Sequence, residues 1–197
     1  MIKAVIFDAG GVIITSSDAY GFLAKKLGIS DARMLEARKK YVWPAQRGEL
    51  STDEFLTKFS DELKVDKEKI KKLFEEGSSL LSVNAEVLKI VDALKKGGYA
   101  LAMITNTVKF YSNFMKEQDV YRKFSPMIAS YEVGLRKPDP KIYKIALEKL
   151  KLKGEDCVFI DDKEEHLAPA AKLGMKTILF KNAEQLKADL QKLGVKI

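Results

Sequence analysis

The chain has 197 residues, a length that suits one hydrophobic core or one core carrying a small insertion. Hydrophobic residues make up 46% and charged residues 32%, which excludes a disordered or collagen-like chain. No apolar run approaches the roughly 18 residues of a membrane-spanning helix, and Asp8 interrupts the apolar N-terminus before it reaches signal-peptide length. The single cysteine, Cys157, excludes an internal disulfide and is typical of a reducing compartment. We therefore expect a globular, cytoplasmic protein with no membrane partner.

The net charge of +7 comes from 35 basic and 28 acidic residues. A basic excess can indicate nucleic-acid binding, but here lysines are scattered among acids, as in residues 141–151. The sequence has no basic tract interleaved with aromatic residues and no zinc-ligand spacing. We therefore expect a solvated, lysine-rich surface and no nucleic-acid partner.

Short apolar runs followed by polar or glycine residues predict buried strands. They lie at residues 4–7, 99–105, 157–160 and 177–180, with a weaker candidate at 127–129. Helical patterns separate them, at 85–96 behind an Asn84 N-cap, from the Pro138–Pro140 region to Leu150, at 168–173 and at 184–193. Strands that alternate with helices in this way predict an α/β fold with a Rossmann-like parallel sheet.

One stretch, residues 18–79, shows helical periods and no strand pattern. A first helix ends at Gly28, a second spans 35–42, a capping box at 51–54 opens a third, and Asp66 caps a fourth. This pattern predicts a four-helix cap at residues 16–84, inserted into a core formed by residues 1–15 and 85–197. The tethers between the two are expected near residues 15–17 and 82–83.

Polar side chains follow three of the predicted strands. Asp8 ends the first, Thr105 and Asn106 the second, and the pair Asp161 and Asp162 the third. In an open parallel sheet, ligands bind outside the carboxyl ends of the strands. Adjacent carboxylates repel unless a cation or a shared proton compensates them, so this edge predicts a hard, oxygen-ligated cation such as Mg²⁺.

Four segments, in order along the chain, resemble the four motifs of the haloacid dehalogenase superfamily. They are FDAGGVI at 7–13, TNT at 105–107, GLRKPDPKIY at 134–143, and FIDD at 159–162 with PAAKLGM at 169–175. Within the superfamily the chain is most similar to the phosphatase domain of soluble epoxide hydrolases and to bacterial sugar-phosphate phosphatases with a helical cap. The segment RGELS at 47–51 also resembles a cap segment of that subgroup.

The resemblance implies a Mg²⁺-dependent phosphatase that acts on a small phosphomonoester, possibly a sugar phosphate, as a monomer or a homodimer. Asp8 would be the nucleophile and form an aspartyl-phosphate. A second Asp8 oxygen, the carbonyl of Gly10 and Asp162 would hold Mg²⁺. Asp161 would act on the metal from further out or through water.

The resemblance also implies the phosphate-binding residues. The hydroxyl of Thr105 and the backbone amide of Asn106 would bind the phosphoryl group. Lys137 would offset the negative charge of the nucleophile and the substrate, as phosphoryl transfer requires.

The chain departs from the family pattern at three places. Gly10 stands where phosphatases usually carry an aspartate general acid, which favours substrates with good leaving groups or a proton donor from the cap. His166 stands where Asn is common, and we interpret it as a helix-surface histidine, with a role in the site as the alternative. Residues 15–18 match no specificity signature.

Two other functions remain as alternatives. A regulatory or scaffold protein could keep the pocket without turnover. A metal-independent 2-haloacid dehalogenase would also lack the acid, although Gly10 and the Asp161–Asp162 pair argue against it. Tyr20 and Arg47 are candidates for reaching the substrate from the cap, whereas Cys157 is expected to fill the core.

Overall fold

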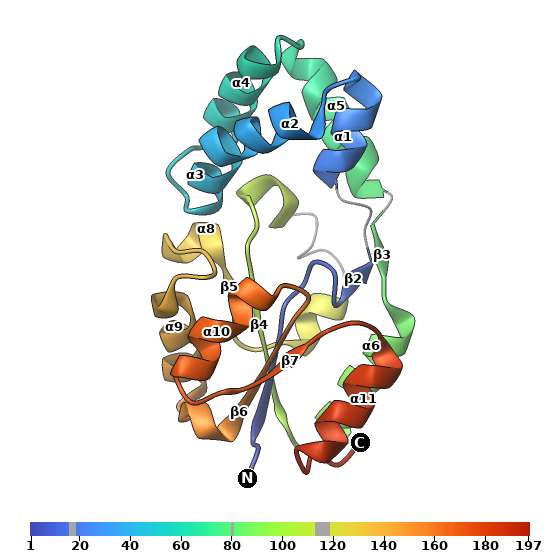
Figure 1. Cartoon of the computed structure of the whole chain (residues 1–197), viewed down its shortest axis with the longest axis vertical. Helices are drawn as coiled ribbons and strands as arrows, with labels where there is room; N and C mark the ends of the chain where they lie inside the picture. The colour runs from blue at the N-terminus through green and yellow to red at the C-terminus, as the bar shows by residue number, and fades with distance from the viewer. Residues whose placement is uncertain (16–18, 80, 113–118) are drawn as a thin grey trace.

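The computed structural model describes residues 1–15, 19–79, 81–112 and 119–197. A block of helices occupies one end of the molecule, and a sheet flanked by helices occupies the other (Figure 1). Both termini lie at the end away from the helical block. Within the described ranges, no helix is long and apolar enough to cross a membrane.

The main sheet has five parallel strands in the order β5-β4-β1-β6-β7. The strands are β1 (Ala4–Phe7), β4 (Ala100–Thr105), β5 (Met127–Ala129), β6 (Cys157–Asp161) and β7 (Lys176–Leu179). All five predicted strands are therefore present, and the α/β class is confirmed. The central strand β1 pairs Phe7 with Met103 on one side and with Ile160 on the other, so the carboxyl ends of β1, β4 and β6 lie together.

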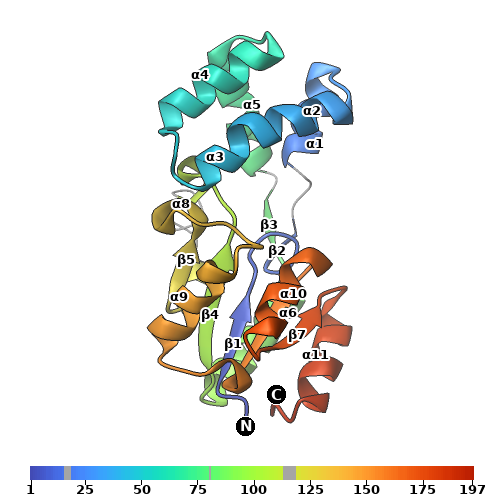
Figure 2. The same ribbon diagram turned by 60° about the vertical axis from the view of Figure 1, so that its left-hand side comes forward.

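The two faces of the sheet carry alternate strand residues, because successive side chains of a strand point to opposite faces. Val5 and Phe7 pack with α6 (Ala85–Lys96) and α11 (Ala183–Lys192) on one face. Ala4 and Ile6 pack with α9 (Pro140–Leu150) and α10 (Glu164–Lys172) on the other. Figure 2 shows the sheet between these two helical layers. Because both faces are covered, the strands read as continuous apolar runs.

The predicted helix start at residue 85 is confirmed. Asn84 is the N-cap of α6, and its side chain accepts a hydrogen bond from the backbone N–H of Val87. The prediction for α10 was wrong at its start, because the helix begins at Glu164 and not at residue 168. His166 therefore lies in the first turn of α10, directly after the end of β6. Shorter elements of this part include the 3₁₀ helices η2 (Asp119–Lys123) and η3 (Gly154–Asp156), and α8 (Ser130–Val133).

The helical block comprises α1 (Ala19–Leu27), α2 (Asp31–Ala37), the π-helix η1 (Arg38–Val42), α3 (Trp43–Gln46), α4 (Thr52–Leu63) and α5 (Lys67–Ser79). The capping box at the start of α4 is confirmed, with Ser51 and Glu54 each accepting from the other's backbone N–H. The predicted helix at 35–42 was wrong in its bounds. Helical structure starts at Asp31, after the Ser30 N-cap, and continues through the π-helix η1 into α3. Pro44 lies in the first turn of α3, where a helix tolerates proline.

Aromatic rings form the centre of the helical block. Phe55, Phe59 and Phe74 pack with ring centroids 5.4–5.9 Å apart, and the Tyr20 ring meets Phe74 edge-on at 5.8 Å. Val108, which follows β4, joins this cluster. Two short strands flank the block in the sequence, β2 (Ile14–Thr15) before it and β3 (Ser82–Val83) after it. They pair antiparallel with each other.

Candidate active site

Three aspartates meet at the carboxyl edge of the sheet. Asp8 follows β1, Asp161 ends β6, and Asp162 comes next. Each offers a carboxylate oxygen, and these oxygens lie within 4.8 Å of one another. Asp161 is fully buried and Asp8 is 7% exposed, whereas Asp162 is open to solvent. The parallel register of β1 and β6 brings these side chains together.

Lys137 places an ammonium group between two of these carboxylates. It lies in the loop between α8 and α9, and it is fully buried. Its Nζ is 2.8 Å from Asp8 Oδ1 and 2.6 Å from Asp161 Oδ2. A buried lysine is costly unless it is paired, and here the two carboxylates supply the pairing.

Burial and these charges shift the acidity of all the groups. Desolvation raises the pKa of Asp8 to about 6, against the opposing effect of the Lys137 charge. Desolvation also acts to raise the pKa of Asp161, but hydrogen bonding to His166 and the charge of Lys137 hold it at about 2. The two carboxylates raise the pKa of Lys137, despite its burial. The ammonium is therefore charged, Asp161 is ionised, and Asp8 is the carboxylate that holds a proton most easily.

Asp161 is bound on both of its oxygens. Oδ1 accepts from the backbone N–H of Lys163 at 3.0 Å, and His166 Nδ1 lies 2.9 Å from Oδ1 and 3.0 Å from Oδ2. His166 is 3% exposed, so the interpretation as a helix-surface histidine was wrong. Because α10 starts at Glu164, His166 faces back toward the end of β6. Tyr143 fixes the same turn by donating its hydroxyl to the His166 carbonyl at 2.8 Å.

Asn106 connects the end of β4 to the Lys137 loop. Its side-chain oxygen accepts from the backbone N–H of Lys137 at 2.8 Å, and its Nδ2 donates to the Lys137 carbonyl at 2.9 Å. Thr105 beside it is 4% exposed. Ser130, which sequence reasoning missed, is fully buried and its Oγ bonds both the N–H and the carbonyl of Thr107. No local pattern in the sequence indicates that serine.

The two glycines after β1 have different constraints. A Cβ on Gly11 would lie 2.4 Å from Asp162 Oδ2, and the Gly11 backbone has a φ of +81°, so Gly11 lets the Asp162 carboxylate approach. A Cβ on Gly10 would meet none of the described atoms within 4 Å. The position where the general acid is missing therefore has room for a side chain.

The helical block reaches this edge through α3 and the turn after it. Arg136 Nε donates to Gln46 Oε1 at 3.2 Å, and Gln46 Nε2 donates to the Asn106 carbonyl at 3.4 Å. The Arg136 guanidinium lies 4.6 Å from the centre of the Trp43 ring. At Gly48 the backbones come so close that a Cβ would lie 2.5 Å from the Tyr131 carbonyl. Sequence reasoning missed Gln46 and Arg136, because their meeting depends on how the block sits on the sheet.

The remaining sequence candidates lie in different surroundings. Tyr20 is 9% exposed within the aromatic centre of the helical block. Arg47 is half-buried and forms an ion pair with Glu49, with Nε 2.5 Å from Oε1. Cys157 is fully buried in β6, and burial raises its pKa to about 11, which suits a core residue and not a nucleophile. Of the linker residues at 15–18, only Thr15 lies within the described residues.

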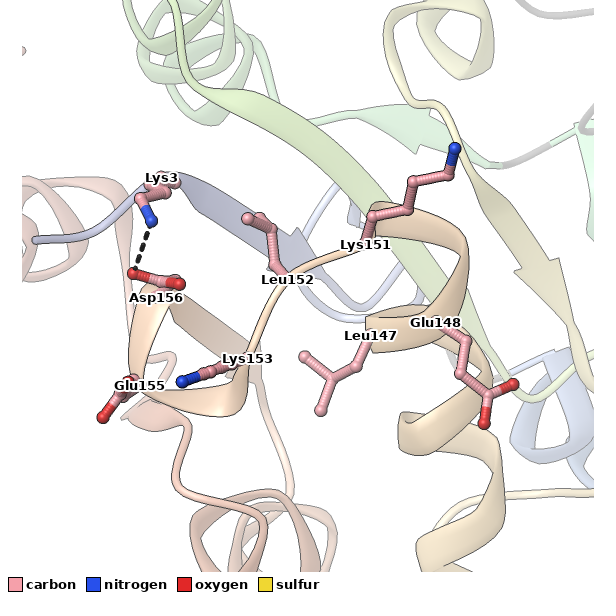
Figure 3. Close-up of a pocket in the computed structure, with 8 residues that line it drawn as sticks. All are labelled: Lys3, Leu147, Glu148, Lys151, Leu152, Lys153, Glu155 and Asp156. Atoms are coloured by element: carbon pink, nitrogen blue, oxygen red, sulfur yellow. Dashed lines mark ion pairs between the residues drawn. The ribbon is translucent and has the colours of Figure 1, made fainter.

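A hollow of about 580 Å³ lies elsewhere, at the opposite edge of the sheet (Figure 3). Lys3 and Asp156 line it, just before β1 and β6 begin, and they form an ion pair of 3.2 Å. Its charged lining residues are three lysines and three acids, namely Lys3, Lys151, Lys153, Glu148, Glu155 and Asp156. This balance of charge gives no preference for an anion or a cation.

The parallel sheet, the helical insertion and the acidic edge indicate an α/β enzyme whose site lies at the carboxyl ends of the strands. Residues 2–174 match the family model of the haloacid dehalogenase-like hydrolases. The chain belongs to this family and is a hydrolase, as the four sequence motifs predicted.

Several relatives in this family are phosphatases or hydrolases of phosphate-bearing molecules. The chain is 27% identical to bifunctional epoxide hydrolase 2 of Sus scrofa over 214 residues, covering 98% of this chain but 39% of that protein. It is 28% identical to flavin mononucleotide hydrolase 1 of Arabidopsis thaliana over 198 residues, covering 100% of this chain and 79% of that protein. Over 102 residues it is 34% identical to glyceraldehyde 3-phosphate phosphatase of Pyrococcus furiosus, covering 50% of this chain and 42% of the relative. The chain therefore spans less than half the length of the epoxide hydrolases it matches.

Solved structures share the fold along the whole chain. A predicted HAD-like hydrolase from Porphyromonas gingivalis matches with a TM-score of 0.82 at 22% identity and covers 100% of both chains. A magnesium complex of a HAD family enzyme from Bacteroides thetaiotaomicron matches with a TM-score of 0.77 at 24% identity, covering 99% of both chains. A dehalogenase structure matches with a TM-score of 0.70 at 20% identity, covering 100% of this chain and 98% of the other. At these identities the likeness shows the fold alone.

The donor set at the acidic edge fits a divalent cation with a preference for oxygen. Three carboxylates and the Lys137 ammonium leave two net negative charges when all are ionised. Burial chiefly raises the pKa values of Asp8 and Asp162, and repulsion from Asp161 adds to it; a divalent ion bound there would stabilise the ionised carboxylates against both effects. Carboxylate oxygens are the ligands that Mg²⁺ takes in phosphoryl-transfer enzymes.

Proposed function

We propose that this hydrolase is a Mg²⁺-dependent phosphatase for a small phosphomonoester and that Asp8 forms an aspartyl-phosphate. The observation that carries the proposal is the pairing of Asp8 with a fully buried lysine at the carboxyl edge of the sheet. A carboxylate held in this way is a fixed nucleophile beside a fixed positive charge, which is what phosphoryl transfer needs. Relatives that are phosphatases support the same reaction class.

Among the described residues, Ala9 and Lys137 contact the Asp8 carboxylate at the same oxygen. Its Oδ1 accepts from the backbone N–H of Ala9 at 2.7 Å and meets Lys137 Nζ at 2.8 Å. We assign Oδ2 to the attack on phosphorus. As the bond between Asp8 Oδ2 and phosphorus forms, the P–O bond to the leaving group breaks, and the leaving oxygen takes a proton from water. A second water then attacks phosphorus and loses a proton to solvent, and the bond between Asp8 Oδ2 and phosphorus breaks, which regenerates the Asp8 carboxylate and releases inorganic phosphate.

The bound Mg²⁺ would lie against Asp8, Asp162 and the Gly10 carbonyl, and it would neutralise charge on the phosphoryl oxygens. Asp161 would act on the metal ion from further out or through water, because its own oxygens already contact His166, Lys163 and Lys137. Thr105 and the backbone N–H of Asn106 would bind the phosphoryl group. The Asn106 side chain would keep Lys137 in register with them, through its two hydrogen bonds to the Lys137 backbone.

Residues 16–84 would act as a cap over a core of residues 1–15 and 85–197. A cap that closes on this edge excludes water and selects the substrate. The missing acid at Gly10 would then restrict the enzyme to good leaving groups, such as those of sugar 1-phosphates or acyl phosphates. A cytoplasmic location, and a monomeric or homodimeric state, stay predictions.

The test is a panel of phosphorylated metabolites and an aryl phosphate, assayed with Mg²⁺ and with EDTA. We expect Mg²⁺-dependent release of phosphate by the wild type and a loss of at least about a thousandfold in Asp8→Asn, because the nucleophile is gone. Asp53→Asn is the matched control, since Asp53 is exposed and forms a surface ion pair with Lys67.

Each alternative function has its own outcome in this panel. Mg²⁺-dependent turnover that survives in Asp8→Asn contradicts the mechanism. Turnover of no phosphate favours a scaffold protein. Release of halide from a 2-haloacid in EDTA favours the dehalogenase.

A further inference from the structure

Arg136 lies between the helical block and the lysine of the acidic edge. It directly precedes Lys137 in the loop between α8 and α9, and its own side chain is half-buried. Its guanidinium lies 4.6 Å from the centre of the Trp43 ring, and its Nε donates to Gln46 Oε1 at 3.2 Å. Trp43 and Gln46 are the first and last residues of α3, so one face of that helix holds the guanidinium by two contacts.

The same glutamine also contacts the loop after β4, which would bind the phosphoryl group. Gln46 Nε2 donates to the Asn106 carbonyl at 3.4 Å. The Asn106 side chain in turn bonds both backbone groups of Lys137, the N–H at 2.8 Å and the carbonyl at 2.9 Å. Because Lys137 is joined covalently to Arg136, these contacts form a closed circuit. We call Gln46, Asn106, Arg136 and Lys137 the interface circuit.

The interface circuit connects the helical block to the position of the Lys137 ammonium. The Lys137 N–H that Asn106 binds belongs to the peptide unit between Arg136 and Lys137. A shift of the Arg136 side chain therefore reaches the Lys137 backbone across one peptide unit. Lys137 Nζ lies 2.8 Å from Asp8 Oδ1, and a displacement of about 1 Å at a reacting group can cost about a hundredfold in rate.

A close backbone approach lies next to the interface circuit. Gly48, which follows α3, has a φ of +71°, and a Cβ on it would lie 2.5 Å from the Tyr131 carbonyl. Tyr131 belongs to α8, which precedes the loop that carries Arg136. The contacts of Arg136 therefore belong to the arrangement in which the helical block is seated on the sheet side.

We propose that Arg136 is a positioning residue that the seated helical block holds, and that it aligns the Lys137 ammonium with the phosphoryl group through the interface circuit. This inference rests on the proposed phosphatase function and adds how that site is completed. It implies that the helical block, besides selecting the substrate, completes the alignment of the sheet-side groups.

Steady-state kinetics separates positioning from substrate selection. Arg136→Gln and Gln46→Met each open the circuit, and we expect each to lower kcat about tenfold to a hundredfold while KM changes less than about threefold. We expect the same loss for an aryl phosphate and for any metabolite that the panel identifies, because Lys137 acts on the phosphoryl group that they share. A residue that only covered the substrate would raise KM instead, by different amounts for the two substrates.

A double variant tests whether Arg136 and Gln46 act as one unit. If both hold Lys137 through the same circuit, combining Arg136→Gln with Gln46→Met lowers kcat no further than the more damaging single variant does. Arg33→Gln is the matched control, because it removes the same charge from a guanidinium that contacts two carbonyls at the end of α4, inside the helical block. We expect Arg33→Gln to keep kcat.

The fluorescence of Trp43 reports the contact without any turnover. Trp43 is the single tryptophan of the chain, and the Arg136 guanidinium lies over its ring. We expect acrylamide to quench the emission about twofold more strongly in Arg136→Gln than in the wild type, because the ring loses this cover. Quenching in Arg33→Gln is expected to equal that of the wild type, and circular dichroism checks that each variant is folded.

Four results overturn the inference. They are an unchanged kcat in Arg136→Gln and Gln46→Met, a loss that lies in KM, single losses that multiply in the double variant, and equal quenching of Trp43 in the wild type and Arg136→Gln. Failure of the proposed function differs from all of these. In that case the wild type would release no phosphate, although its Trp43 quenching would still differ from that of Arg136→Gln.

Discussion

Two regions meet at the carboxyl edge of the sheet, and they are built in opposite ways. The sheet side gathers three carboxylates around Lys137, with hydrogen bonds on both oxygens of Asp161. The helical block brings arginines supported by aromatic rings. The first region is an acidic cluster with one buried ammonium group, whereas the second presents guanidinium groups against aromatic rings.

The two regions also differ in how firmly they are held. The sheet side is a continuous network of buried contacts between 2.6 and 3.0 Å, from Asp8 to His166. The helical block reaches that network through a longer hydrogen bond from Gln46 to the Asn106 carbonyl, at 3.4 Å, and it packs against the sheet side at Val108. Reaction chemistry needs fixed groups, whereas substrate entry needs a contact that can open. The difference suggests that the sheet side determines the reaction and the helical block determines the substrate.

The largest effect is expected when the sheet-side network loses its cation. Lys137→Met leaves Asp8 and Asp161 as adjacent, buried carboxylates with no ammonium between them. Removing one partner of a buried ion pair costs about 3–5 kcal/mol. We expect this loss in the free energy of urea unfolding, and a fall in kcat/KM of at least about a thousandfold.

The matched control is Lys123→Met, which removes a partly exposed lysine paired with Asp92. Surface ion pairs contribute about 1 kcal/mol or less. Equal losses of unfolding free energy in the two variants would show that Lys137 contributes no more to stability than a surface ion pair does.

A smaller effect is expected from the pH dependence of stability, because Asp8 has a pKa of about 6 against the usual 3.8. An acid with a raised pKa binds protons more tightly in the folded state, so the contribution of Asp8 to wild-type stability falls as pH rises from about 4 to 6 and is then level. Asp8→Asn lacks this fall. In EDTA, its stability relative to the wild type is expected to rise by about 3 kcal/mol across that window.

Chemical unfolding at a series of pH values measures this difference. Saturating Mg²⁺ is expected to reduce it, because the metal ion stabilises ionised Asp8 in the wild type. A relative stability that stays constant from pH 4 to 7 would contradict the assigned charge state of Asp8.

The smallest effect is expected from supplying the acid that the sheet side lacks. Gly10→Asp fits, because a Cβ there meets none of the described atoms within 4 Å and the Gly10 backbone is not among those with positive φ. General acid catalysis is worth about a hundredfold or more. We expect kcat for alkyl phosphates to rise by about this factor, with a smaller gain for aryl phosphates, whose leaving groups need no proton.

Gly10→Asn is the control, because it has the same shape and no acid. A gain in both variants would indicate a packing effect. No gain in either would indicate that the helical block already supplies the proton.

Local patterns in the sequence predicted most of the fold. Apolar runs identified the five strands, and the Asn84 cap and the Ser51 capping box identified helix starts, because each signal depends on neighbouring residues only. The start of α10 was missed, since no apolar period or capping side chain marks Glu164. The burial of His166 was missed as well, because its contact with Asp161 depends on where α10 begins relative to β6.

The sequence by itself determined the α/β order of elements, the helical insertion and the polar residues at the strand ends, because these follow from periodicity and from short motifs. Only the tertiary structure decided which of those groups touch. Strand register brings Asp8 to Asp161, the loop after α8 inserts Lys137 between them, and α10 turns His166 onto Asp161. The meeting of Gln46 and Arg136, 90 residues apart in the chain, depends on how the helical block rests on the sheet. Such contacts between distant segments leave no local signal, because either side chain would look ordinary among its own neighbours.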